Sequence, residues 1–167
     1  MAFNICAVGR VRAPALAGVL AIAMIACGPA GATGFTLGNA RVDPAFTCPN
    51  PADNFAYDVH GTIDADNSTG STVTIESMSS TTTTVAIHGS WLGQMGETDQ
   101  EPDLQFSPST VGSGSKATVR FTIPFGCTDT PHEGVLDTYG EFAVHISVVT
   151  SAGTFELDAN KHRLTTP

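Results

Sequence analysis

Basic side chains are scarce in this sequence. The chain of 167 residues has 7 Lys and Arg against 16 Asp and Glu, and two of the basic residues, Arg10 and Arg12, lie within the first 32 residues, which contain no acidic one. Nucleic acids and anionic lipid surfaces are both bound through basic protein surface. The composition therefore argues against a nucleic-acid-binding protein and against electrostatic docking on a membrane.

The sequence also lacks the motifs of the common enzyme classes. No Gly-x-Ser-x-Gly nucleophile elbow occurs, and His132-Glu133 lacks the second His of a zinc protease. No glycine-rich loop opens a helix that could hold a phosphate. We therefore expect a protein without enzymatic activity, the alternative being a hydrolase whose site is assembled only in space.

Only one long apolar run is present, near the N-terminus. Arg10 and Arg12 precede an apolar stretch over Ala15–Ile25, and small residues follow it to Ala32. This pattern is typical of a secretory signal, and the run is shorter than the roughly 20 residues of a membrane-spanning helix. We predict a bacterial-type signal peptide over residues 1–32 and one domain over 33–167, exported to the periplasm or the cell exterior.

Two processing sites fit this leader. Ala30-Gly31-Ala32 matches ordinary signal cleavage, which would release the protein. Residues 24–27 resemble a lipobox, in which Cys27 would be lipidated and would anchor the protein to a membrane. Free secretion and a lipid anchor therefore both remain open, and no later segment is apolar enough to span a bilayer.

Cysteine is nearly absent beyond the leader. Only Cys48 and Cys127 remain there, at a spacing unlike the close pairs of metal or redox sites. In an oxidising compartment two such cysteines most simply form one disulfide. The closed loop of about 80 residues would stabilise the fold by roughly 4–5 kcal/mol through lost chain entropy.

Helical periodicity is lacking as well, and short β patterns alternate with turns. The strongest strand is predicted over 116–125, with Lys116, Arg120 and their neighbours of the same parity facing solvent. Strands at 142–149 and 154–158 are predicted to form a hairpin around residues 151–153. Weaker strands are predicted at 35–42, 57–63, 73–78, 85–91 and 104–106. Residues 64–70, 92–103, 107–115 and 128–138 are predicted as turns or loops, and 79–84 as a turn or an exposed edge.

About seven such strands indicate an all-β fold. The architecture resembles an immunoglobulin-like antiparallel β-sandwich. The resemblance stops at architecture, because Trp91 comes late in the chain and Phe125, not a tyrosine, stands two residues before Cys127. We therefore expect the disulfide to join an N-terminal segment to the end of a strand.

Three histidines share the solvent-facing parity of their predicted strands: His60, His88 and His145. If these strands are neighbours, the imidazoles would cluster on one sheet face, where they would suit copper or zinc with Met78 or Met95 nearby. The alternative interpretation is three unrelated surface histidines.

Acidic residues alternate with neutral ones over 97–103. Glu97, Asp99, Glu101 and Asp103 supply the hard oxygen ligands that Ca²⁺ prefers. A solvated, charged loop is the alternative interpretation.

Taken together, these patterns predict an exported, non-enzymatic domain with a binding or structural role in the cell envelope or outside the cell. Its partner would be a protein or a glycan. We expect recognition in the loops Leu92–Asp103 and Thr128–Thr138, with Trp91, Met95 and His132 as candidate contacts. The alternative function is a periplasmic or extracellular metal-binding protein using Cu, Zn or Ca.

Overall fold

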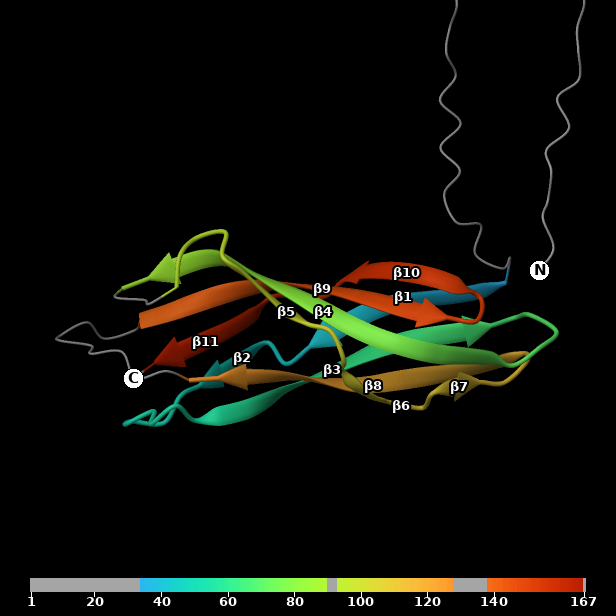
Figure 1. Cartoon of the computed structure of the whole chain (residues 1–167), viewed down its shortest axis with the longest axis horizontal. Helices are drawn as coiled ribbons and strands as arrows, with labels where there is room; N and C mark the ends of the chain where they lie inside the picture. Colours follow the sequence, from blue (N-terminus) through green and yellow to red (C-terminus); the bar gives the residue numbers. More distant parts are fainter. Residues whose placement is uncertain (1–33, 90–92, 128–137, 167) are drawn as a thin grey trace, which may run out of the picture.

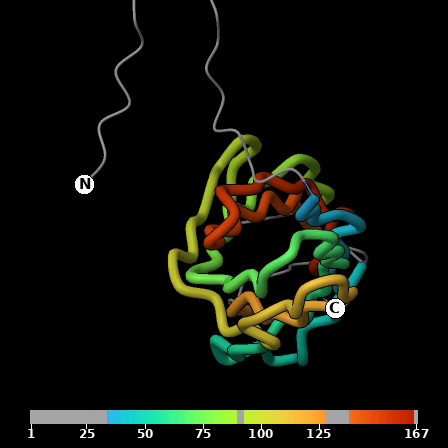
Figure 2. Tube along the Cα trace, turned by 90° about the vertical axis from the view of Figure 1, so that its right-hand side faces the viewer, coloured from blue at the N-terminus to red at the C-terminus, as the bar shows by residue number. Residues whose placement is uncertain are grey.

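The structure, a computed structural model, describes residues 34–89, 93–127 and 138–166, and every regular element within them is a β-strand. The strands run roughly along the long axis of the body in two facing layers (Figure 1). Figure 2, viewed along that axis, shows the two layers around a common interior. The predicted boundary at residue 32 lies outside the described residues and stays a prediction.

The first layer is an antiparallel sheet of four strands. In spatial order these are β1 (Phe35–Val42), β3 (Ala56–Asn67), β8 (Ser115–Gly126) and β6 (Gln105–Ser107). The β3–β8 pair continues without a break over twelve residue pairs, from Ala56 opposite Gly126 to Asn67 opposite Ser115. We call this layer the four-stranded sheet.

The second layer contains the remaining strands. Its main path is β2 (Ala45–Thr47), β11 (His162–Thr166), β9 (Thr138–Thr150), β4 (Val73–His88) and β5 (Thr98–Glu101). Two shorter strands join this path, β10 (Gly153–Asp158) beside β9 and β7 (Thr110–Val111) beside β4. Among the described strands, β2 and β11 are the only parallel pair.

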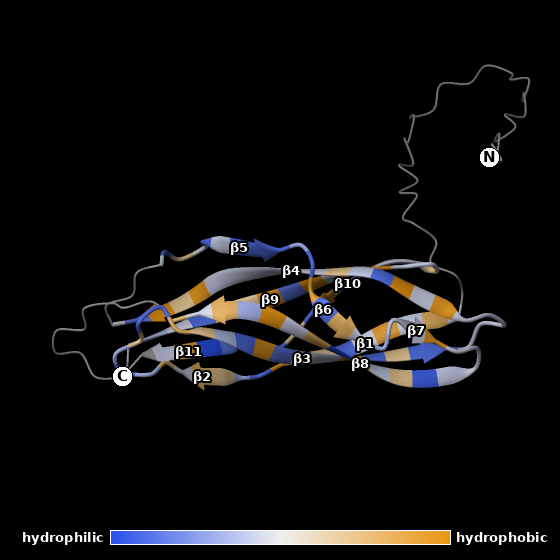
Figure 3. Cartoon of the chain, turned by 60° about the horizontal axis from the view of Figure 1, so that its bottom comes forward, coloured by the Kyte–Doolittle hydropathy of each residue, from blue (hydrophilic) through white to orange (hydrophobic). Residues whose placement is uncertain are grey.

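Alternating side chains form the core between the layers. Along the middle of β3 and β8 alternate residues are buried, among them Val59, Ile63, Val119 and Ile123, and they share one core with Ile146 and its neighbours on β9. Figure 3 shows this alternation as orange and blue bands along the strands. The predicted all-β, immunoglobulin-like sandwich is confirmed, as are the strong strand at 116–125 and the hairpin at 142–158.

Several predicted turns are wrong, because strands continue through them. Residues 79–84 lie inside the unbroken strand β4, where Ser80, Thr82 and Thr84 are buried. The strand β3 extends through Asp64 to Asn67, a buried amide that donates to the carbonyls of Ser71, Val111 and Gly112. Polar residues are typical of turns, but here the backbone of 79–84 pairs with β5 and β9, and the Asn67 amide is hydrogen-bonded inside the sandwich.

The predicted disulfide joins the two layers at one end of the body. Cys48 follows β2, Cys127 follows β8, and their sulfurs are bonded. Both residues are buried in a small cluster with Ala52 and Leu164, separate from the main core. The bond therefore links an N-terminal segment to a strand end, as the sequence predicted.

Gly61 and Phe121 form a tight pair at the centre of the four-stranded sheet. They are directly opposite on β3 and β8, and both are buried. A Cβ on Gly61 would lie 2.2 Å from Cζ of Phe121. The ring therefore lies against the bare Cα of Gly61 on the inner side of the sheet, and the outward side is left to their neighbours.

Candidate functional site

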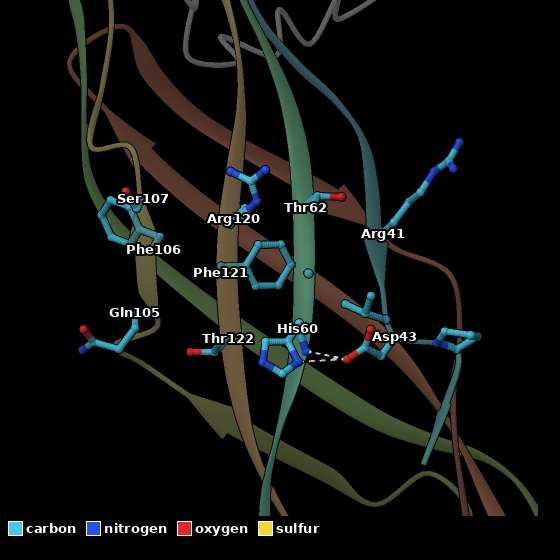
Figure 4. A pocket seen from close by; sticks show the side chains of 13 residues that line it. Arg41, Asp43, His60, Thr62, Gln105, Phe106, Ser107, Arg120, Phe121 and Thr122 are labelled. Atoms are coloured by element: carbon cyan, nitrogen blue, oxygen red, sulfur yellow. Dashed lines mark hydrogen bonds and ion pairs between the residues drawn. The ribbon is translucent and has the colours of Figure 1, made fainter.

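A groove of about 560 Å³ crosses the outer side of the four-stranded sheet. Its lining comes from all four strands of that sheet and from Asp43 and Pro44, which follow β1. Figure 4 shows two rows of polar side chains on either side of Phe121. The rows exist because side chains on adjacent antiparallel strands stand directly opposite one another.

The first row contains two arginines. It crosses the four strands from β1 to β6, each residue being opposite the next. In order, the row is Arg41 of β1, Thr62 of β3, Arg120 of β8 and Ser107 of β6. Neither arginine forms a hydrogen bond or an ion pair with any residue that the structure describes. Both side chains are exposed, so their guanidinium groups are free to bind a ligand.

The second row contains Asp43, the only carboxylate among the described lining residues of the groove. His60 already donates two hydrogen bonds to it. Oδ2 of Asp43 accepts hydrogen bonds from the backbone N–H of His60 at 3.0 Å and from Nδ1 of His60 at 3.1 Å. Thr122 and Gln105 continue the row on β8 and β6. Asp43 therefore contacts His60 and forms no ion pair with either arginine.

Asp43 also connects the groove to a buried histidine. The carbonyl of Asp43 can only accept, so Nδ1 of His162, 2.7 Å away, must carry a proton. In the neutral ring Nε2 then accepts the hydroxyl hydrogen of Tyr57 at 3.0 Å. Burial lowers the pKa of His162 and raises that of Tyr57, so both groups are held neutral.

A second polar network lies on the outer side of the other sheet. Nδ1 of His145 is 2.8 Å from Asp158, and its Nε2 is 3.0 Å from Glu156. Carboxylates accept only, so both contacts require a proton on each ring nitrogen. The bond to Asp158, together with that to Glu156, raises the pKa of His145. The nearby hydroxyl of Ser147 donates to Glu156, not to the imidazole.

The predicted histidine cluster is wrong. All three histidines are exposed, but His60 lies in the four-stranded sheet while His88 and His145 lie in the other one. His88 stacks on Tyr139, six residues along β9 from His145. Shared parity fixes only which side of a strand a residue faces, and here the strands belong to opposite layers.

The acidic segment is not a loop along its whole length. Asp99 and Glu101 lie in β5, an edge strand paired with β4, with Glu97 before it and Asp103 after it. Within the described ranges, no group of three or more His, Cys, Asp or Glu residues could hold a metal ion. Alternating charges on an edge strand instead discourage pairing with another chain.

The remaining candidates divide between exposed and undescribed positions. Met95 is 61% exposed in the turn before β5, beside the bond from the Gln94 amide to Glu97. Cys27, Trp91 and His132, with most of the predicted loop 128–138, lie outside the described residues. Also within the described ranges, no helix has the length and hydrophobicity that crossing a membrane requires.

Sequence reasoning missed the groove. Alternation predicts the outward parity of His60 and Arg120, but it does not predict the pairing that places Arg41 beside Thr62. That pairing joins residues 21 positions apart after a bulge between Gly38 and Arg41. Because register depends on tertiary packing, alternation along single strands carried no signal for it.

Comparisons with known proteins give structural neighbours only, since no protein-family model and no curated protein matches the chain. The CooA pilin subunit from enterotoxigenic Escherichia coli is 10% identical, with 78% of this chain and 99% of that one covered and a TM-score of 0.33. The seventh PapD-like domain of human CEP192 is 14% identical, with 92% and 96% covered and a TM-score of 0.26. The ApaA protein from Bordetella pertussis is 15% identical, with 83% and 98% covered and a TM-score of 0.39. At these values the neighbours carry no conclusion about a ligand, and the sandwich assignment rests on the two sheets themselves.

Proposed function

We propose that this chain is an exported, non-enzymatic binding domain whose ligand site is the groove on the four-stranded sheet. The observation that carries the proposal is the pair of unpartnered arginines, Arg41 and Arg120. Each of the other described basic side chains is paired: Lys116 with Asp66, and both Lys161 and Arg163 with Glu141. In a chain so rich in acid, two free guanidinium groups in one groove indicate a site that receives an anionic group from outside.

The geometry of the groove supports binding without catalysis. Asp43 orients His60, and Thr122 is opposite His60 on the next strand, but no hydrogen bond joins the imidazole to this hydroxyl. The floor offers no free backbone amides, because β3 and β8 are paired with strands on both sides there. A hydrolase would need an activated nucleophile and donors for an oxyanion.

Export is supported by the leader and by the disulfide, which persists in oxidising compartments. Residues 1–32 fused to an alkaline phosphatase that folds only outside the cytoplasm should give active enzyme in a bacterial host. Arg10→Glu with Arg12→Glu should abolish that activity. An inactive fusion would contradict export.

Binding is tested with protein purified after expression of the full chain. A panel of saccharides and peptides is screened against the wild type, the double variant Arg41→Gln/Arg120→Gln and the control Lys116→Gln, which changes a basic residue of the same sheet outside the groove. We expect ligands whose signal is lost in the double variant and kept in the control. A panel in which no signal depends on these arginines would refute the groove as the site.

A further inference from the structure

The two arginines have a fixed spacing across the sheet. Arg41 and Arg120 are separated by one strand, β3, and adjacent strands lie about 4.8 Å apart, which places their Cα atoms roughly 10 Å apart. Thr62 lies between them and Ser107 lies beyond Arg120 in the same row. A ligand along this row meets two cations separated and flanked by hydroxyl groups.

The rest of the lining combines hydrogen-bonding and apolar groups. Thr122 and Gln105 supply a hydroxyl and an amide in the second row. Among the apolar lining residues only Pro44 is exposed, whereas Val42, Gly61 and Phe121 are buried and Phe106 packs against the core beneath the groove. Outward hydroxyl, amide and guanidinium groups match a sugar, whose hydroxyl groups both donate and accept hydrogen bonds.

The position of the groove disfavours a peptide. Extended peptides commonly bind by adding to a free sheet edge, where backbone N–H and C=O groups are unpaired. The middle of this groove instead lies over β3 and β8, whose backbones are paired with each other along their whole length, and the edge strands β1 and β6 line only its two ends. A ligand across the middle of the groove therefore meets side chains, and these carry guanidinium, hydroxyl and amide groups.

Flanking carboxylates limit the charge density of the ligand. On β3 the outward residues on either side of the groove positions are Asp58 and Asp64, both exposed. A densely charged polymer such as nucleic acid would be repelled by them as it left the groove. A short saccharide with one carboxylate per sugar carries fewer charges per unit length than a nucleic acid duplex and would meet the arginines with less repulsion.

We infer that the groove binds an acidic saccharide, a short run of sugars bearing carboxylate groups that pair with Arg41 and Arg120. This inference rests on the proposed function and names the ligand class of the same site. Each carboxylate would accept a forked pair of hydrogen bonds from a guanidinium group. The neutral hydroxyls of the ligand would bond to Thr62, Thr122, Ser107 and Gln105.

The test is calorimetric titration of the purified protein with a tetramer of galacturonic acid. The matched probe is its methyl ester, which keeps the sugars and removes the charges. We expect the acid to bind and the ester to bind at least about tenfold more weakly. Arg41→Gln and Arg120→Gln should each weaken binding of the acid about tenfold, the effect of losing one charge-assisted interaction. Lys116→Gln should leave it unchanged.

The contradicting outcomes separate the two claims. Equal binding of acid and ester, or no effect of the arginine substitutions, would overturn the acidic-saccharide inference. Arginine-dependent binding of a tetraglutamate peptide without binding of the saccharide would overturn the inference and leave the proposed function standing. No arginine-dependent ligand in the wider panel would overturn both. Unchanged circular dichroism of the variants, whose substituted side chains are exposed, confirms that they are folded.

Discussion

At the scale of single residues, Asp43 connects the surface to the interior. Its carboxylate holds His60 at the groove, and its carbonyl accepts from His162 behind it. His162 lies in β11, and its bond to Tyr57 of β3 joins the two sheets. Since His162 is completely buried, each of its ring nitrogens needs its partner.

Tyr57→Phe should destabilise the fold by about 1–3 kcal/mol, because it leaves Nε2 of His162 buried without a donor. The ring would keep its stack on Phe46, so packing is preserved. Urea unfolding followed by circular dichroism measures the change. Tyr139→Phe serves as the control, because that ring is held by stacking on His88 and by Arg163 above it. Equal effects of the two substitutions would contradict the role of the hydroxyl.

His145→Gln should destabilise the fold more at about pH 5.5 than at about pH 9. The folded pKa of His145 is raised, so its contribution is present below the unfolded pKa of about 6.5 and is lost as pH rises through the folded value. The network is exposed, so a difference of a few tenths to about 1 kcal/mol is expected. Chemical unfolding of both proteins at the two pH values checks this, and a difference independent of pH would contradict it.

His162 acts in the opposite direction. Burial lowers its folded pKa, so its contribution is present above pH about 6.5 and is lost as pH falls below that value. The comparison of wild type with His145→Gln isolates the His145 part, because His162 is common to both proteins.

At the scale of elements, the alternation of apolar and polar residues predicted which face of each strand is buried. It did not predict how long the strands are or which strands lie beside one another. The apolar parity of 116–125 predicted β8, its core face and the outward position of Arg120. The short strands β2 and β11 went unpredicted, because three to five residues without alternation carry little signal. The site could be predicted only in part, since it needs β1, β3, β8 and β6 in one register.

Gly61→Ala should destabilise the fold by about 1–3 kcal/mol, the usual cost of overpacking a core. The new methyl group would collide with the buried ring of Phe121. Gly38→Ala on β1 is the control, because no atom lies within 4 Å of its Cβ position. Adding Phe121→Leu to Gly61→Ala should recover part of the loss. Thermal unfolding of all variants decides, and a neutral Gly61→Ala would contradict the close packing.

At the scale of the whole molecule, the disulfide joins two sheets that are also held together by the core. It closes a loop between residues 79 positions apart and lies with Leu164 in its own small cluster at one end. This arrangement suits a domain that works outside the cytoplasm, where the bond persists and where the acidic surface keeps copies apart.

Replacing both cysteines, Cys48→Ser with Cys127→Ser, should lower the free energy of unfolding by about 4–5 kcal/mol through the regained entropy of the unfolded chain. Denaturant unfolding of the variant and of the chemically reduced wild type should give coinciding curves. A loss below about 1 kcal/mol would show that packing alone holds this end of the sandwich.

The most direct test of the central claim is an amide NMR titration of the isotope-labelled protein with the galacturonic acid tetramer. The groove predicts shifts confined to Arg41–Asp43 of β1 and its end, His60–Thr62 of β3, Gln105–Ser107 of β6 and Arg120–Thr122 of β8. Those shifts should disappear in Arg41→Gln/Arg120→Gln. Shifts confined to the second sheet, or to the segment around Met95, would contradict the account.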